Sequence, residues 1–401
     1  MLDNTGTRQL CYVVKIDAIE PIVGSDNCEA AVVGGWKVMV RKGTFNAGDL
    51  AIYFEIDSHV DTTKPEFAFL EKKHGNVKTQ KYTFGGKNPG FYSQGLLMSA
   101  KDFGWDAASL VEGDFLTEKL GVTYAEPEDN KRKAKSNPDA RINAALARHP
   151  KIARKWGKVI KRNKFLRRVF ILLFGKKRDV RNWPAEVKKT DEERIENRLW
   201  TLQDREKIWV ATEKVDGSSS TFHLRRGHGF KKPEYFVCSR NVVFDTPAKE
   251  AHNYYKDTIG NIWTEMSAKY DMRAKLQQLL DERPTAKWVT IQAETFGAGV
   301  QRRYYGMSDH DLRAFNLIYS DCGRVGTLEM RDTLEKIGIP SVPVISEAMT
   351  LPSTIEELRE FVHSAPSLID GGMKEGIVFR SLDGSDSFKC VDPEFLVRYH
   401  Q

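Results

Sequence analysis

Short apolar segments separated by turn residues dominate the first 120 or so residues. Four apolar runs of strand length lie at Tyr12–Ile16, Ala30–Val33, Trp36–Val40 and Leu50–Phe54. Gly34-Gly35 separates two of these runs, which is a typical hairpin signal. Strands this short and this closely spaced predict a small β-barrel, and we interpret residues 1–124 as an OB-fold domain.

The pattern is different in residues 183–401, where apolar strands and longer amphipathic helices are mixed. Strand-length runs lie at 208–212, 235–238, 289–293 and 376–380, and helical patterns lie at 262–280 and 354–363. The strands and helices do not alternate regularly, which disfavours a doubly wound parallel sheet. The pattern predicts an α+β domain over residues 183–401, and hence an α+β chain with a β-barrel at its start.

The segment between these two regions carries the basic excess of the chain. Residues 131–181 hold 19 Lys/Arg and two Asp, a net charge of +17, whereas the whole chain carries only +7. Residues 141–174 have a helical pattern that we expect to break at Pro150 and at Gly157. Such a charge asymmetry indicates a polyanionic partner, so residues 125–182 are predicted to be a basic helical linker that binds phosphates. A solvated helical insert and a membrane-surface helix are the other two interpretations.

Composition excludes several classes of protein. The apolar run Val169–Phe174 is far shorter than the roughly 20 residues that span a bilayer. The N-terminus lacks the features of a secretory signal. The cysteines are five, widely spaced and without a C-x-x-C pair, which argues against a zinc site or a disulfide framework. We therefore expect a cytoplasmic protein; basic runs such as Lys131-Arg132-Lys133 keep a nuclear location open.

The sharpest chemical signal is Glu213-Lys214-Val215-Asp216-Gly217, which directly follows an apolar strand. A strand end followed by a tight turn can hold a lysine amine in place for attack on phosphorus. The amine attacks only when it is unprotonated, so its surroundings must favour the neutral form. Taken alone, the pattern fits a surface turn equally well.

Further candidates follow this lysine in order. Arg240 comes after an apolar strand and offers a bidentate phosphate donor. Glu294 ends another strand and can accept hydrogen bonds from ribose hydroxyls. Phe315 can stack on a base. Two more candidates are Glu375, which begins a strand and suits a hydrated magnesium ion, and Lys389, which suits a phosphate.

This ordered series resembles the collinear motifs of the covalent nucleotidyltransferases, which comprise DNA ligases, RNA ligases and capping enzymes. Within that superfamily the chain resembles the fifth family of ATP-dependent RNA ligases, which joins an N-terminal OB domain to a ligase domain with antiparallel sheets. The stretch Lys189–Asn197 and the early Gly34-Gly35-Trp36 carry this part of the resemblance. Only twelve residues follow Lys389, too few for the C-terminal OB domain that DNA ligases and capping enzymes typically have.

The resemblance implies an RNA ligase that joins 3′-hydroxyl and 5′-phosphate ends, through lysyl-AMP and an adenylylated strand, in RNA repair. ATP and Mg²⁺ or Mn²⁺ would be its cofactors. Lys214 would take AMP. The nucleotide would be bound by Glu213, Arg240, Glu294, Phe315, Lys389 and Arg194, and the metal by Glu375 through water.

Two positions depart from the family pattern. Many relatives have two lysines spaced K-x-K in the last motif, whereas Ser387 stands in the first of these positions here. Ser219 stands where some RNA ligases have asparagine. Ser387 is therefore expected to slow adenylylation unless a residue of the basic segment supplies the missing charge.

Two other functions remain open. The first is a DNA ligase, because the residues do not show which sugar is read. The second is a non-catalytic nucleic-acid-binding relative, which Ser387 and the basic segment would suit. In either case the expected partner is a nucleic acid, with RNA or an RNA-containing nicked duplex preferred, no membrane and a monomeric chain.

Overall fold

The computed structural model describes residues 1, 3, 8–84, 90–125, 142, 146, 149–174, 183–188, 192–227, 229, 232–240, 242–244, 261–303 and 305–400. Residues 1–124 and 182–401 form one compact unit, and residues 125–181 form a second. The basic run 131–133 lies outside the described residues.

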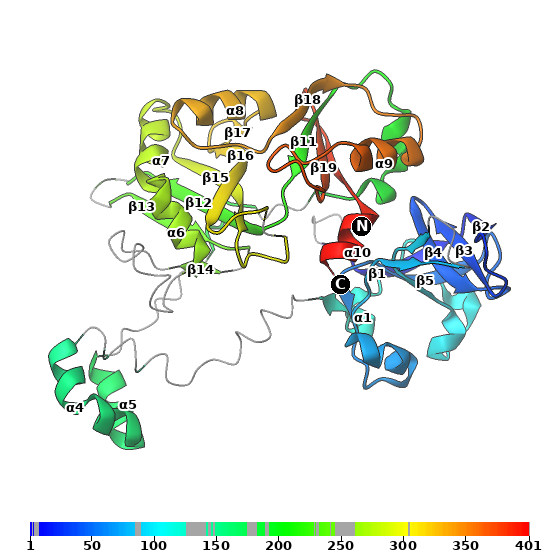
Figure 1. The fold of residues 1–401 in the computed structure, drawn as a ribbon, viewed down its shortest axis with the longest axis horizontal. Helices are drawn as coiled ribbons and strands as arrows, with labels where there is room; N and C mark the ends of the chain where they lie inside the picture. The colour runs from blue at the N-terminus through cyan, green and yellow to red at the C-terminus, as the bar shows by residue number, and fades with distance from the viewer. Residues whose placement is uncertain are drawn as a thin grey trace. The chain divides into compact units, whose positions relative to one another are not determined.

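The first unit begins with short antiparallel strands (Figure 1). One sheet has the order β1-β5-β9, a second has the order β2-β3-β4, and two further pairs are β6 with β10 and β7 with β8. The strands that the apolar runs predicted are β1, β3, β4 and β5. The strand bounds are β1 Cys11–Lys15, β2 Ala18–Pro21, β3 Cys28–Val33, β4 Trp36–Arg41, β5 Leu50–Phe54, β6 Ser58–His59, β7 Gln80–Tyr82, β8 Phe91–Ser93, β9 Leu96–Met98 and β10 Thr123–Tyr124.

Helical turns fill the spaces between these strands. Their bounds are η1 Pro65–Lys73, η2 Ala100–Phe103, η3 Ala107–Ser109 and α1 Thr117–Leu120. Alternate residues of β1 and β5 point to two different hydrophobic clusters: Val13 and Ile52 belong to one, and Val14 and Ala51 to the other. Burial on both faces is what a closed barrel wall with helices outside it requires.

The rest of the first unit contains two antiparallel sheets. The smaller has the order β18-β11-β19-β20 and the larger has the order β14-β13-β12-β15-β16-β17. The strand bounds are β11 Trp209–Lys214, β12 Ser218–Arg225, β13 Glu234–Cys238, β14 Val243–Phe244, β15 Trp288–Gly297, β16 His310–Tyr319, β17 Gly323–Arg324, β18 Val344–Met349, β19 Gly376–Ser381 and β20 Ser387–Val391. The helix bounds are η4 Ile195–Asn197, η5 Leu199–Gln203, α6 Ile262–Lys269, α7 Met272–Asp281, α8 Thr327–Lys336, α9 Ile355–Ser364 and α10 Pro393–Tyr399.

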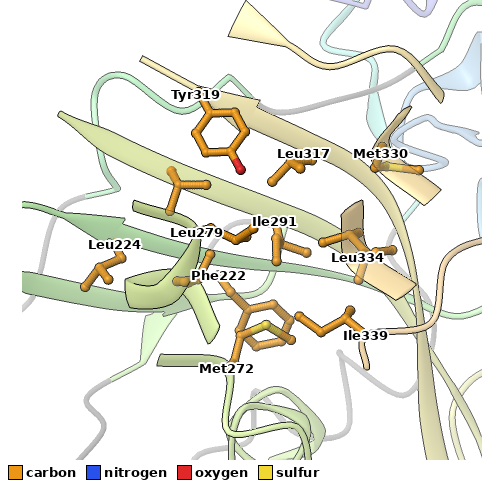
Figure 2. Packing of buried hydrophobic residues seen from close by; sticks show 14 of the residues in the cluster. Phe222, Leu224, Met272, Leu279, Ile291, Leu317, Tyr319, Met330, Leu334 and Ile339 are labelled. Carbon is orange, nitrogen blue, oxygen red and sulfur yellow. The ribbon is translucent and has the colours of Figure 1, made fainter. Parts of the chain in front are cut away.

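Helices α7 and α8 pack on one face of the larger sheet (Figure 2). Phe222 of β12 and Ile291 of β15 are fully buried there against Met272 and Leu334. Because strand side chains alternate between faces, the intervening residues of β12 and β15 point to the opposite face. That second face is polar and includes Ser219 and its cross-strand partner Glu294.

The single helix expected over 262–280 is two helices. Helix α6 ends at Lys269, and Asp271 has a left-handed backbone (φ 45°) before α7 begins. Asp tolerates this conformation better than most residues. The kink lets both helices contact the same sheet, since α6 and α7 each touch β15.

The second unit contains α4 (Pro150–Arg162) and α5 (Lys164–Phe174). The predicted break at Pro150 is confirmed, because His149 is non-helical and Pro150 begins α4. The predicted break at Gly157 is wrong: α4 continues through it, and Gly157 is buried. The chain breaks instead at Asn163, whose backbone is extended (φ −95°, ψ 114°).

The barrel and the two-sheet region share buried contacts within the first unit. Asn197 accepts a hydrogen bond from the indole N–H of Trp36 at 2.7 Å and donates one to Glu55 at 3.0 Å. Val391 and Leu396, at the end of the chain, belong to the same hydrophobic cluster as Trp36. Gly35 permits this approach, because a Cβ there would lie 2.6 Å from the Cα of Glu196.

Candidate active site

The predicted lysine lies at the junction of the two sheets. Lys214 is the last residue of β11 in the smaller sheet, and β12 of the larger sheet begins four residues later. The turn between them is held from both sides. The Asp216 backbone N–H donates to the hydroxyl of Tyr305 at 2.7 Å, and Asp216 Oδ1 lies 3.1 Å from Nε2 of His400. Val215 is buried in one cluster with Phe296, so the turn is rigid.

Carboxylates surround the Lys214 ammonium group. Its Nζ lies 2.6 Å from Oε2 of Glu375. Burial alone would lower the pKa of Lys214, but the charges of Glu375, Glu294 and Asp216 outweigh it, and the pKa is raised. These carboxylates therefore favour the protonated, unreactive form of the lysine. The expectation that its surroundings favour the neutral amine does not hold for this state of the site.

Glu375 is delivered by an anchored loop. The preceding Lys374 is buried, and its ammonium donates to the carbonyls of Val362 and Ala365 at the end of α9. A cation at the C-terminus of a helix satisfies carbonyls that lack intrahelical partners. The residue after Glu375 is Gly376, which begins β19. A Cβ at Gly376 would overlap the carbonyl oxygen of Cys390.

Glu294 lies on β15 and faces the same space from the larger sheet. Burial raises its pKa to about 8; the nearby Lys214 lowers the pKa, and Glu375 and Asp216 raise it further. Arg240 also lowers the pKa of Glu294, so its guanidinium lies within electrostatic reach of this carboxyl. These candidates thus share one electrostatic environment.

Phe315 lies where β16 is irregular. In the β15–β16 register Gln292 pairs with Asn316 and Ala293 pairs with Ala314, which leaves Phe315 as the extra residue of a β-bulge. The bulge moves Phe315 to the face opposite the hydrophobic core. There it is half-buried beside Val215, which follows the lysine.

Lys389 and Arg194 form a second group on the smaller sheet. Lys389 pairs across the sheet with Val378, which pairs with Thr212, so Lys389 and Lys214 lie on the same face. Lys389 and Arg194 line one small cavity together with Arg8, and the carboxylates of Glu55, Glu192 and Glu193 line the same cavity. Arg194 is buried, and among the described residues its Nε and Nη1 have no hydrogen-bond partner. Buried guanidinium donors of this kind suit an anion such as a phosphate.

Glu213 points the other way. Its carboxylate accepts hydrogen bonds from the Ser367 hydroxyl at 2.6 Å and the Leu368 backbone N–H at 2.7 Å, on the face opposite Lys214. Burial raises the pKa of Glu213, and these two hydrogen bonds oppose that effect. The structure does not bring this side chain into the site.

The structure places both residues that depart from the family pattern, Ser387 and Ser219. The hydroxyl of Ser387 donates to Glu192, whose carboxylate also binds Arg380 at 3.0 Å. Arg380 is buried and pairs with Ser387 across β19 and β20. A cation therefore lies directly opposite Ser387, but it is already paired with Glu192. Ser219 lies opposite Glu294 in the register of β12 and β15.

No group of three or more His, Cys, Asp or Glu suited to a metal ion occurs in the described part of the chain. Glu375 therefore offers a carboxylate to a metal whose other ligands would have to be water or substrate. Mg²⁺ binds in this way at many phosphate-processing sites. The donor set fits such an ion.

Sequence reasoning missed His400 and Tyr305, which hold the turn after Lys214. Burial lowers the pKa of His400, but its hydrogen bond to Asp216 outweighs this, and the pKa is raised. Neither residue lies in a local motif: Tyr305 is 89 residues and His400 is 184 residues from Asp216 in sequence. No signal in a single sequence would have paired them.

Comparison with known proteins agrees with this geometry. A family model described as OB-fold domain matches residues 10–98, which confirms the predicted barrel. A family model described as RNA ligase matches residues 207–391, which include every strand from β11 to β20. This match identifies residues 207–391 as a domain of the RNA ligase family. The chain is an enzyme of the ligase class, with the α+β fold predicted from its sequence.

Solved structures with the same fold come from an RNA ligase of Naegleria gruberi. A mutant of that enzyme with ATP and Mn is 23% identical, with a TM-score of 0.71 over 98% of this chain and 100% of that chain. The same enzyme with PPi is 22% identical, with a TM-score of 0.70 over 98% and 99%. Another mutant with AMP and Mn is 22% identical, with a TM-score of 0.69 over 98% and 99%. No curated protein sequence matches the chain.

Proposed function

We propose that this RNA ligase uses ATP to join 3′-hydroxyl and 5′-phosphate RNA ends, through lysyl-AMP and an adenylylated strand. One observation carries the proposal. In a domain of the RNA ligase family, a lysine at the sheet junction lies beside two glutamates from two different sheets, Glu375 at 2.6 Å and Glu294 within electrostatic reach. The similarity to a ligase solved with ATP and Mn supports the choice of nucleotide and metal.

In the first step the Lys214 amine attacks the α-phosphorus of ATP. A nitrogen–phosphorus bond forms, the bond to pyrophosphate breaks, and the amine loses its proton. Glu294 would bind the ribose hydroxyls, and Phe315 would stack on adenine. Lys389 and Arg194 would bind phosphate oxygens and offset the charge that develops on them.

The remaining site residues take supporting roles in this proposal. Arg240 would bind the phosphate of the nucleotide or of the RNA end. The carboxylate of Glu213 is already bound to Ser367 and Leu368, so Glu213 would act by fixing the end of β11 below the nucleotide. A Mg²⁺ or Mn²⁺ ion held by Glu375 through water would supply positive charge to the phosphates.

The proposed function also implies a domain organisation and a substrate. We assign 1–124 to the OB-fold domain, 125–182 to a basic helical linker and 183–401 to the nucleotidyltransferase domain. The substrate is RNA or an RNA-containing nicked duplex, the chain acts as a monomer in the cytoplasm or nucleus, and its role is repair of RNA ends. No described helix is both long enough and apolar enough to cross a membrane.

The first test is to incubate the protein with α-labelled ATP and magnesium in the absence of nucleic acid. We expect label that survives denaturation and is discharged by pyrophosphate. GTP and NAD, tested in parallel, should give none. The sugar preference is tested next by comparing nicks that end in a ribonucleotide or a deoxyribonucleotide 3′-hydroxyl. Sealing of both with equal efficiency would contradict the assignment to RNA.

Formation of lysyl-AMP should accelerate as the pH rises. Only the neutral amine attacks phosphorus, and the carboxylates around Lys214 raise its pKa. Below that pKa, the neutral fraction increases about tenfold per pH unit. Single-turnover labelling at saturating ATP, from about pH 6 to about pH 9, should show this rise. A rate that stays flat or falls over this range would contradict the assignment of Lys214 as the group that loses the proton.

Replacing His400 should slow the first step without removing it. His400→Ala deletes the 3.1 Å contact to Asp216, and hydrogen bonds to charged groups contribute roughly 1.5–3 kcal/mol. We therefore expect lysyl-AMP formation to slow by about ten- to a hundredfold. His400→Gln retains a side-chain N–H donor and should recover part of the rate. Equal rates for the wild type and His400→Ala would show that the contact is dispensable.

A further inference from the structure

Helices α4 and α5 form a hairpin with a core of its own. Ile160 of α4 and Phe170 of α5 are buried together with Ile142 and Leu146, which precede the hairpin. Gly157 is also buried, so a small residue occupies the packed side of α4. The hairpin belongs to the second compact unit. Its own packing buries part of its apolar side, while Val159 and Leu166 remain 46% and 38% exposed.

The outer surface of the hairpin is strongly basic. Residues 140–178 contain no Asp or Glu. On α4, Lys155, Lys158 and Arg162 are exposed and lie at helical spacings of three and four residues, which places them on one side of the helix. A surface with many cations and no acidic residue nearby attracts a polyanion.

Two aromatic side chains of the hairpin are exposed. The side chain of Trp156 is 53% exposed, and that of Phe165 is 72% exposed. Each lies next to a lysine in the sequence, Lys155 in one case and Lys164 in the other. Exposed large rings are costly in water unless a partner covers them. Proteins that bind single-stranded nucleic acid combine exposed rings, on which bases stack, with cations that contact the phosphates.

We propose that the α4–α5 hairpin binds the single-stranded end of the RNA substrate, with Lys155, Lys158 and Arg162 on phosphates and Trp156 and Phe165 on bases. The inference rests on the proposed function for the identity of the polyanion. An anionic membrane would also attract this charge, and Leu173 is 67% exposed. RNA is favoured because residues 207–391 of the same chain match the RNA ligase family, whose substrate is the polyanion RNA.

Charge reversal tests the phosphate contacts. In Lys155→Glu/Lys158→Glu/Arg162→Glu, the KM for RNA in strand joining should rise about tenfold or more, and the dependence of RNA affinity on salt should become weaker. The matched control Lys232→Glu/Lys287→Glu/Lys336→Glu changes the charge equally at three exposed lysines of the ligase region and should leave RNA affinity unchanged. Equal losses in both triple variants would overturn the proposal.

Lysyl-AMP formation without RNA separates the two proposals. It should be normal in the hairpin variant, because the substitutions leave the nucleotide site intact. Absence of lysyl-AMP from the wild type would refute the proposed function. Normal lysyl-AMP together with an unchanged KM for RNA in the hairpin variant would refute the inference about the hairpin alone.

Replacing the rings tests the base contacts. Trp156→Ala/Phe165→Ala should weaken binding of a labelled single strand of about 20 nucleotides by tenfold or more, with less effect on a blunt duplex. Vesicles with and without anionic lipid, tested by flotation, address the other partner. Flotation with anionic vesicles that the ring variant loses, with unchanged RNA affinity, would assign the hairpin to a membrane surface and overturn the proposal.

Discussion

Lys214→Ala is expected to form no lysyl-AMP at all. Among the described residues, the side chains that hydrogen-bond to Lys214 or Asp216 are a carboxylate, a histidine and a tyrosine. Lys389, the other amine of the proposed site, would bind phosphate oxygens rather than attack. Labelling with α-labelled ATP, followed by denaturing electrophoresis, measures the loss directly. The fold should persist, because the Lys214 side chain is part-exposed and its loss leaves no cavity in a hydrophobic cluster.

Two controls make this result specific. Lys214→Arg retains the positive charge between Glu375 and Glu294 but stays protonated, so it should also form no lysyl-AMP. An RNA strand that already carries AMP on its 5′-phosphate bypasses the lysine, and Lys214→Ala should still seal it at a measurable rate. Label on Lys214→Ala equal to that on the wild type would contradict the assignment of the nucleophile.

Gly217→Ala is expected to reduce lysyl-AMP formation by about a hundredfold or more. A Cβ at this position would overlap the carbonyl oxygen of Thr295 and lie 3.0 Å from Cγ of Glu294. The overlap involves the backbone of the central strand β15, so relief requires the turn after Lys214 to move. A displacement of about 1 Å in the reacting group is enough for a loss of this size.

The same substitution should lower the free energy of unfolding by roughly 1–3 kcal/mol, the usual cost of an overpacked methyl group. Denaturant unfolding and single-turnover labelling measure the two effects. Gly326→Ala is the matched control, because a Cβ there meets no atom within 4 Å and the backbone is not left-handed. Wild-type activity in Gly217→Ala would show that the turn tolerates a side chain and that its close contact is not needed.

Local sequence patterns were sufficient to predict most strands and the order of the candidate residues along the chain. Each apolar run was long enough to identify a strand, and Lys214, Glu294 and Glu375 were proposed as site residues because each lies at the end or start of such a run. Hydrophobic alternation depends only on near neighbours in the chain. The same reasoning failed at Gly157, because helix packing against α5 outweighs the low helix propensity of glycine.

The sequence by itself therefore determined the fold class and the basic segment, and it predicted Lys214 as the attacking lysine, since these depend on composition and on short-range pattern. Only the tertiary structure decided how the groups act on one another. It placed Glu375 on the Lys214 ammonium, turned Glu213 to the opposite face of the sheet and brought His400 to Asp216. These contacts join residues more than 150 positions apart, and the pKa of each group depends on burial and on neighbouring charge, which only the folded chain creates.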